Sequence, residues 1–131
     1  MPISFDSALG IHDKALLVRS RRAELLASNI ANGDTPGYKA KDIDFKSAFE
    51  NIQAQRNSGL KLTHSNHIQQ SSQIAGMDVM YRVPNAASLD GNTVDSQLEK
   101  SAFAENALRY QASLTFLDMK FKGLVAAFKG E

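Results

Sequence analysis

The feature that most constrains this chain is an unbroken row of apolar residues in its C-terminal third. Alternating steps of four and three from Phe103 meet only apolar or aromatic side chains. These residues, called the apolar stripe below, are Phe103, Ala107, Tyr110, Leu114, Leu117, Phe121, Leu124 and Phe128. Such spacing, near 3.5 residues, is typical of a helix packed along another helix. We therefore predict a single helix over residues 93–131, with Thr93 as its N-cap and a length on the order of 55 Å.

The N-terminal segment, residues 5–31, carries a second row at the same spacing. Its apolar members are Phe5, Leu9, Leu16, Ala23, Leu26 and Ile30. His12 and Arg19 interrupt this row, and we expect these two polar side chains to face particular neighbouring subunits. The row predicts a helix about 40 Å long, paired with the C-terminal helix as a coiled coil. Arg19, Arg21 and Arg22 form a basic cluster that we assign to a solvated or intersubunit face, with nucleic acid or anionic lipid as the alternative contact.

The middle of the chain shows weaker and mixed patterns. A short amphipathic helix is predicted over residues 42–56, through Ile43, Phe45, Phe49 and Ile52. Two stretches alternate at period two as strands do, Leu60–Thr63 and Met77–Pro84. Residues 65–76 are polar and are expected to form a loop, or to become ordered only against a partner.

The predicted fold class is therefore mainly α. Long N- and C-terminal helices pair as a coiled coil, and a short middle helix accompanies an irregular or β-hairpin-like central segment. We expect one structural unit in three parts: the N-terminal helix with its turn, the central segment and the C-terminal helix, at residues 1–38, 39–92 and 93–131.

Composition excludes several classes of protein. The 15 basic and 14 acidic residues give a net charge of +1, without the basic excess of a nucleic-acid-binding protein. The absence of cysteine excludes disulfides and thiolate metal sites. No apolar run approaches the roughly 18 residues of a membrane span. The first residues lack the pattern of a cleaved signal peptide, so we expect a cytosolic protein or export by a route that uses none.

Candidate catalytic and metal-binding residues are weakly supported. His64 and His67 share a helical face only if their segment is helical, and no further ligand accompanies them at metal-site spacing. Asp90, Asn92 and Asp95 lack the terminal Glu of a calcium loop, so capping and turn formation explain them better. Since no nucleophile motif is present, we expect no enzyme, no metal, no cofactor and no small-molecule substrate.

Two motifs flank the long helices. In the first, Ala31–Tyr38, we expect Gly33 to form a left-handed helix cap, Pro36 and Gly37 to form a tight turn, and the Tyr38 hydroxyl to be free to bond a neighbour. The second, Ser88–Asp95, contains Asp90-Gly91-Asn92-Thr93 and precedes the C-terminal helix.

The first motif resembles that of bacterial flagellar rod and hook proteins, which carry Ala-Asn-x-x-Thr-Pro-Gly-Tyr after their first helix. Every position of this core is present, following Asn29, at Ala31, Asn32, Thr35, Pro36, Gly37 and Tyr38. The second motif, and the head of the last helix from Glu99 to Gln111, are similar to those of the smaller rod proteins. The resemblance spans nearly the whole chain and is weakest over residues 53–76.

This resemblance implies a structural subunit of the flagellar basal-body rod, in its proximal part. Such subunits assemble helically with copies of themselves and with other rod subunits into a drive shaft that transmits torque and encloses the export channel. The resemblance also implies contact with MS-ring, rod-base adapter and export-gate proteins, a periplasmic location and export without a cleaved signal peptide. The alternative is a coiled-coil adaptor or secreted helical protein that binds a single partner.

Overall fold

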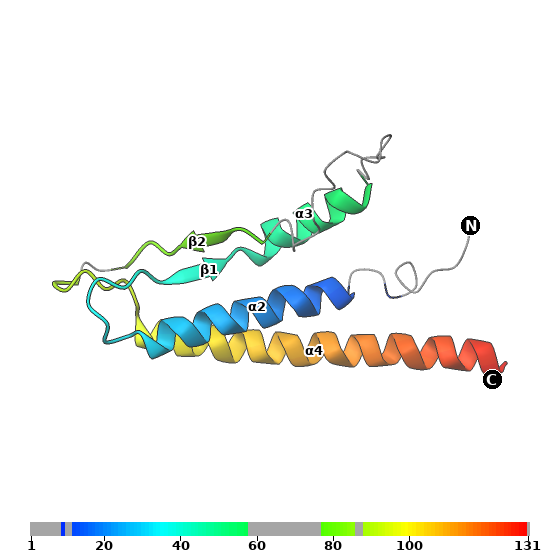
Figure 1. Cartoon of the computed structure of the whole chain (residues 1–131). Coiled ribbons are helices and arrows are strands. Elements are labelled where there is room, and N and C mark those ends of the chain that lie inside the picture. The colour runs from blue at the N-terminus through cyan, green and yellow to red at the C-terminus, as the bar shows by residue number, and fades with distance from the viewer. Residues whose placement is uncertain (1–8, 10–11, 58–76, 86–87, 131) are drawn as a thin grey trace, which may run out of the picture.

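Long helices dominate the architecture, and a small sheet lies beside them. The computed structural model describes residue 9 and residues 12–57, 77–85 and 88–130. Within them, in chain order, lie α2 (His12–Ala31), β1 (Lys41–Ile43), α3 (Phe45–Asn57), β2 (Val79–Tyr81) and α4 (Ser96–Lys129). Figure 1 shows α2 between two layers, with α4 along one side and β1, β2 and α3 on the other. The predicted class, mainly α with a small central strand pair, is confirmed.

Helix α2 is covered on two sides, by α4 and by β1 with α3. Val18 and Leu26 have no exposed surface. On the side of the sheet, Val18 packs in the core with Ile43 and Ala48. Most of the structure's apolar burial is therefore arranged around α2.

The two polar residues that interrupt the N-terminal apolar row, His12 and Arg19, which we expect to face neighbouring subunits, also have partners within the chain. The guanidinium carbon of Arg19 lies 4.2 Å from the centre of the Phe45 ring, a cation–π contact within the chain. The His12 ring lies 6.5 Å from that of Phe116. Both side chains are half-buried by residues of their own chain.

The central segment begins with a strand where we had predicted a helix. Asp42 and Ile43 belong to β1, which pairs antiparallel with β2 so that Ile43 lies opposite Val79 and Lys41 opposite Tyr81. Asp44 ends this strand and starts α3, because its carboxylate accepts hydrogen bonds from the Lys46 amide (3.0 Å) and the Ser47 hydroxyl (2.6 Å). The second strand, β2, lies within the stretch Met77–Pro84 that was predicted to be a strand, and it pairs with residues that were predicted to be helical.

Helix α4 is 34 residues long, or about 51 Å at the usual rise per residue. Its N-cap is Asp95 rather than Thr93, since the Asp95 side chain accepts from the amides of Gln97 and Leu98. The helix ends at Gly130, whose φ of 76° is left-handed and whose amide donates to the Ala126 carbonyl. The predicted C-terminal helix is confirmed, but it begins at Ser96, later than predicted.

The face of α4 that is buried inside the chain is polar. Glu99, Asn106 and Ser113, called the polar row below, are buried and lie seven residues apart. The apolar stripe lies on the adjacent flank: Tyr110, Leu117 and Leu124 are half-buried, whereas Phe103, Ala107, Leu114, Phe121 and Phe128 are exposed. The corresponding N-terminal row is half-buried or buried at Leu9, which precedes α2, and on α2 at Leu16, Ala23, Leu26 and Ile30. Helix α4 thus contacts its own chain mainly beside the stripe that periodicity had selected.

Several predictions lie outside the described residues: Phe5, the strand Leu60–Thr63, the polar segment 65–76, and His64 with His67. In the part of the chain that the structure describes, none of the helices combines the length and the apolar character needed to cross a membrane. Among the same residues, His, Asp and Glu do not gather in groups of three that could hold a metal ion.

Substitution Gly123→Ala should raise the free energy of unfolding by about 1 kcal/mol, because glycine is a poor helix former. A Cβ at this position of α4 would meet nothing within 4 Å. The matched change Gly37→Ala should lower the free energy of unfolding by about 1 kcal/mol, because Gly37 has a φ of +72°, which alanine adopts only with strain. Urea unfolding of the purified chain, followed by circular dichroism, measures both, and an unchanged midpoint in Gly123→Ala would contradict the first.

Candidate assembly site

The two motifs, separated by some fifty residues in sequence, lie against each other at one end of the molecule. The Gly37 amide donates to the Asp90 carbonyl (2.9 Å) and the Thr93 amide donates to the Tyr38 carbonyl (3.0 Å). In return, the Ala40 amide donates to the Thr93 hydroxyl at 2.8 Å. We call this contact between Ala31–Tyr38 and Ser88–Asp95 the motif junction. It joins the end of α2 to the start of α4, which the sequence had not indicated.

Each motif contributes a turn with a left-handed glycine. In the first, the Tyr38 amide donates to the Thr35 carbonyl across Pro36 and Gly37, as in a type II turn with proline then glycine. In the second, the Gly91 amide donates to the Ser88 carbonyl. Gly37 and Gly91 have φ values of 72° and 73°. A Cβ on Gly91 would lie 3.8 Å from the Gly37 Cα, so the turns meet at their glycines.

Asn92 is the central side chain of the motif junction and is 6% exposed. Its Nδ2 donates to the carbonyls of Asn32 (3.1 Å), Gly33 (2.7 Å) and Thr35 (3.0 Å). Its Oδ1 accepts from the Val94 amide at 2.8 Å. Asn92 therefore binds three main-chain carbonyls of the turn that follows α2, of which those of Asn32 and Thr35 also accept main-chain amides.

The remaining residues of the first motif shape the chain after α2. Asn32 Nδ2 donates to the Ser28 carbonyl at 2.8 Å, and Thr35 Oγ1 donates to Asn32 Oδ1 at 3.2 Å. Gly33 is not the left-handed cap that we expected, because it is absent from the glycines with positive φ. A Cβ there would instead lie 3.1 Å from Ser96 Oγ, so Gly33 allows the start of α4 to approach. Ala31, Thr35 and Pro36 are exposed.

The Tyr38 hydroxyl is engaged within the chain, which corrects the expectation that it is free. It lies 3.2 Å from the Ser28 hydroxyl and donates to Asn29 Oδ1 at 3.4 Å. Tyr38 is half-buried. Its polar contacts therefore fix the direction of the chain leaving α2.

Asn29 connects the first motif to the sheet and has no exposed surface. Its Oδ1 accepts from the Lys41 amide (3.0 Å) and its Nδ2 donates to the Lys41 carbonyl (2.7 Å). These are the two bonds that a neighbouring strand would form with β1. Nδ2 also donates to Glu99 Oε2 at 3.1 Å, so one side chain links α2, β1 and α4.

Glu99 belongs to a charged cluster of Arg22, Asp42, Arg82 and Glu99. Arg22 donates to both carboxylate oxygens of Asp42 (2.8 and 2.9 Å). Arg82 donates to Asp42 Oδ2 (2.6 Å) and to Glu99 Oε1 (2.7 Å). Two guanidinium groups and two carboxylates balance in charge. A buried group remains ionised only when it is paired in this way. The cluster thus fixes α2, both strands and α4 in one arrangement.

Charge and burial act in opposite directions in this cluster. Burial alone would raise the pKa of Asp42, but the hydrogen bonds from Arg22 and Arg82 outweigh it and lower that pKa below its usual value. The hydrogen bond to Asp42 raises the pKa of Arg22, against burial, which lowers it. Asp42 therefore remains a carboxylate under conditions in which a free aspartate begins to protonate.

Sequence reasoning assigned Arg22 to a solvated or intersubunit face and gave Asp42 and Arg82 no specific role. The structure instead places Arg22 and Arg82 in the charged cluster, while Arg21 is exposed and pairs with Glu24. A weak signal was present, since Glu99 and Asn106 are polar residues seven apart on a predicted helix. The arrangement has the properties of a rigid joint that sets the directions of two helices.

Substitution Asp42→Asn should lower the free energy of unfolding at pH 7 by about 2 kcal/mol. This is less than for a fully buried pair, because the Asp42 side chain is 20% exposed. The pKa of Asp42 is lower in the folded chain than in the unfolded one, so its stabilisation is complete well above pH 4 and is lost as the pH falls below about 4. In urea unfolding at several pH values, the free energy of unfolding should fall less steeply with decreasing pH in Asp42→Asn than in the wild type. Parallel pH dependences of the two proteins would contradict this.

Substitution Asn92→Asp should lower the free energy of unfolding by about 2–3 kcal/mol, since a carboxylate cannot donate to three carbonyls and would be buried beside them. The exposed neighbour Asp90, changed to Asn, is the matched control and should have a much smaller effect, because the Asn oxygen can still accept from the Asn92 amide, as Asp90 Oδ1 does at 3.0 Å. Hydrogen exchange at the end of α2 and the start of α4 should rise only in Asn92→Asp. Equal effects of the two changes would show that Asn92 does not organise the motif junction.

The chain is similar to known proteins over the region of both motifs. The family model "Flagella basal body rod protein" matches residues 11–39, which contain α2 and the first motif. The flagellar basal body rod protein FlgB of Aeromonas hydrophila is 52% identical over 132 residues, covering 100% of this chain and 99% of that protein. FlgB of Salmonella typhimurium is 44% identical and covers 95% of each chain. FlgB of Cereibacter sphaeroides is 46% identical, over 97% of this chain and 98% of its own.

The adaptor alternative is not favoured by these relatives, whose similarity runs through both motifs and both long helices. The chain therefore belongs to the flagellar basal body rod proteins and, as a member of that family, is a structural and non-enzymatic subunit.

Proposed function

We propose that the chain is the proximal rod subunit, assembling helically with copies of itself and with other rod subunits into the drive shaft around the export channel. The relatives named above match this chain over nearly their full length and all have the name of one rod protein, which supports the assignment to one kind of rod subunit. The proposal includes contacts with the MS ring, the rod-base adapter and the export gate. It also includes a periplasmic location and export without a cleaved signal peptide.

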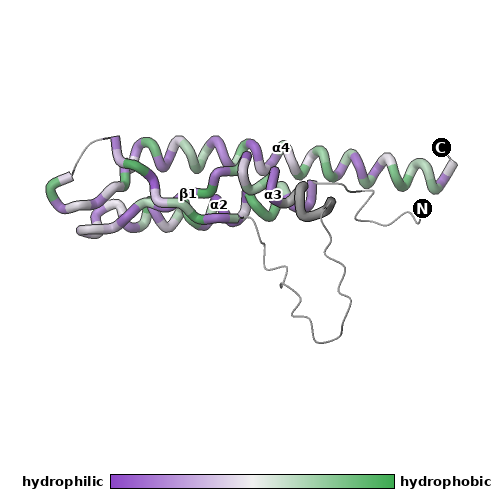
Figure 2. Tube along the Cα trace, turned by 90° about the horizontal axis from the view of Figure 1, so that it is seen from above, coloured by the Kyte–Doolittle hydropathy of each residue, from purple (hydrophilic) through white to green (hydrophobic). Residues whose placement is uncertain are grey.

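The observation that carries this proposal is the exposure of the apolar stripe. Phe103, Leu114, Phe121 and Phe128 of α4 are 38%, 36%, 42% and 88% exposed. Figure 2 shows that the C-terminal end of α4 continues past the elements packed against it, with apolar segments along its length. Contiguous exposed apolar surface marks an interaction site in a soluble protein. Because the stripe has the spacing of helix-on-helix packing, the surface fits a helix of another subunit.

The stripe and the polar row occupy adjacent faces of α4. At about 100° per residue, their centres are separated by roughly 70° around the helix axis. This separation allows α4 to contact α2 with one face while a neighbouring subunit contacts the next. A surface that binds a different surface on the next copy produces a ring, or an open helical assembly where the rotation does not close, rather than a symmetric dimer.

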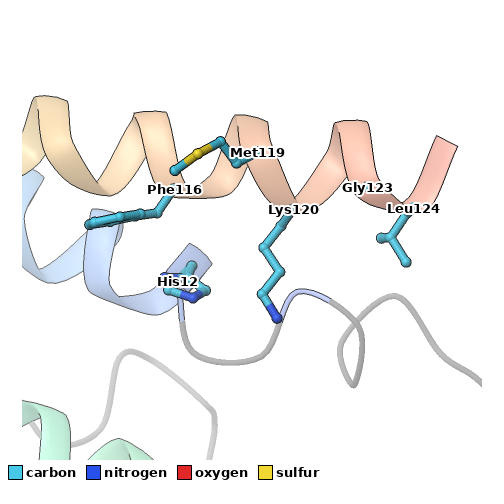
Figure 3. A pocket seen from close by; sticks show the side chains of 6 residues that line it. All are labelled: His12, Phe116, Met119, Lys120, Gly123 and Leu124. Carbon is cyan, nitrogen blue, oxygen red and sulfur yellow. The ribbon is translucent and has the colours of Figure 1, made fainter. Parts of the chain in front are cut away.

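A second apolar surface lies where α2 begins. Figure 3 shows a pocket at this place, lined by His12 on α2 and by Phe116, Met119, Lys120, Gly123 and Leu124 on α4. Its volume is about 490 Å³. The pocket shares Leu124 with the apolar stripe, and so extends the proposed interaction surface toward the C-terminal end of α4.

Substitution Phe121→Ser should reduce incorporation into basal bodies at least about tenfold, because it removes a large apolar side chain from the proposed interface. The free energy of unfolding of the isolated chain should change by less than about 1 kcal/mol, since Phe121 is already 42% exposed. Soft-agar swimming and immunoblots of purified basal bodies, in cells lacking the endogenous gene, provide the measurement.

The matched control is Leu108→Ser, which removes an apolar residue that is 74% exposed on another face of α4. It should support assembly better than Phe121→Ser. Normal incorporation of Phe121→Ser would argue that the apolar stripe is not an assembly surface, and absence of the wild-type chain from basal bodies would refute the function itself.

A further inference from the structure

The small sheet has one edge that the chain itself closes and another that it leaves open. On the side of α2, the Asn29 carboxamide bonds both the amide and the carbonyl of Lys41, as a neighbouring strand would. On the other side lies β2, which is separated from α2 by β1 in Figure 1. The outer edge of β2 therefore lies away from the two long helices.

The hydrogen-bond pattern shows which main-chain groups this outer edge presents. The Arg82 amide donates to the Ala40 carbonyl at 2.9 Å, so the main-chain groups of Arg82 point toward β1. Because bonding residues alternate along an antiparallel strand, those of Met80 also point toward β1, whereas those of Val79 and Tyr81 point away from it. Among the described residues, the outward amides and carbonyls have no main-chain partner. An open strand edge of this kind can bind another strand.

The sequence of this edge is complementary to itself when a second copy runs antiparallel to it. With Met80 opposite Met80 of the second copy, the outward amides and carbonyls of Val79 and Tyr81 are all bonded between the copies. The other cross-strand pairs combine apolar contacts with opposite charges: Met77 with Val83, Val79 with Tyr81, and Asp78 with Arg82. Each of these pairs occurs twice, once on either side of Met80.

The side chains of this edge are available for such contacts. Four large apolar residues of the segment are exposed, namely Val79, Met80, Tyr81 and Val83. Asp78 is exposed as well. Arg82 bonds Asp42 and Glu99, but a guanidinium group has further donors with which it can meet Asp78 of the second copy. Apolar pairs and pairs of opposite charge stabilise neighbouring antiparallel strands.

We propose that two free copies of the chain pair through the outer edges of β2, antiparallel about a two-fold axis at Met80, and form one continuous sheet. This contact is isologous, whereas the proposed shaft is built from heterologous contacts, so the pairing concerns subunits that are not yet assembled. It covers a strand edge that would otherwise be open to aggregation. The inference goes beyond the proposed function and does not depend on it.

The chain has no cysteine, so a single introduced cysteine can report this contact. Met80→Cys places two thiols in a pair whose Cα atoms are about 4.5 Å apart, within the reach of a disulfide. Mild oxidation of the folded chain should therefore give a disulfide-linked dimer, at least about tenfold faster than in the control Val83→Cys.

The control Val83→Cys separates strand pairing from random collision. Val83 is 84% exposed and Met80 is 50% exposed, so collisions alone would link Val83→Cys faster. In the proposed register, however, Val83 lies opposite Met77, and the two copies of Val83 are about 20 Å apart. Equal rates, or a faster reaction of Val83→Cys, would overturn the inference.

A charge reversal tests the register itself. Asp78→Arg, added to Met80→Cys, places like charges opposite each other twice and should slow the crosslinking at least about tenfold. Asp34→Arg makes the same charge change at another exposed residue and should not slow it. Sedimentation of the wild-type chain should show a monomer–dimer equilibrium. A monomer at every concentration, or species that grow beyond the dimer, would contradict a closed pair.

Discussion

A carboxylate buried between helices and strands, that of Glu99, is the group on which the rest of the structure depends. It accepts from Arg82 at 2.7 Å and from Asn29 at 3.1 Å, and Arg82 in turn reaches Asp42. Each bond has a direction as well as a strength, so α4 can take only one rotation and one height against α2 without leaving a charge unpaired. Apolar packing around Val18 stabilises the fold, and these polar contacts join α2, β1 and α4 to one another.

Helix α4 turns polar residues toward the inside of its own chain, where a small protein usually buries apolar ones. The polar row of α4 faces its own chain, while much of the apolar stripe remains exposed beside it. Contacts within the subunit thus gain specificity from hydrogen bonds, and the exposed apolar residues are the surface that we propose for contacts between subunits. The motif junction serves the same end, because Asn92 and the two turns fix the directions in which the chain leaves α2 and enters α4.

The helices could be predicted from sequence because their patterns are long, whereas the polar site could not. Apolar spacing from Phe103 to Phe128 identified α4 correctly, yet periodicity cannot tell whether a face is covered by the same chain or by another. The strand at Asp42 was missed because three residues carry too little pattern, and its place is set by Asn29 and Arg22 from α2. Thr93 was predicted to be the N-cap because threonine is a common N-cap residue. Aspartate is equally common there, and it is the Asp95 side chain that accepts from the first amides of α4. Resemblance identified the two motifs without revealing that they touch.

The way Asn92 is bonded also determines how related chains can diverge. Its Nδ2 binds the main-chain carbonyls of residues 32, 33 and 35, which any amino acid supplies. Arg22, Asp42, Arg82 and Glu99 bind one another's side chains, so a change in one alters what the others can accept. Sequence alignments of the family should therefore show two different patterns. At position 92 we expect a single residue to be retained without coupled changes in other side chains, and in the charged cluster we expect substitutions that occur together.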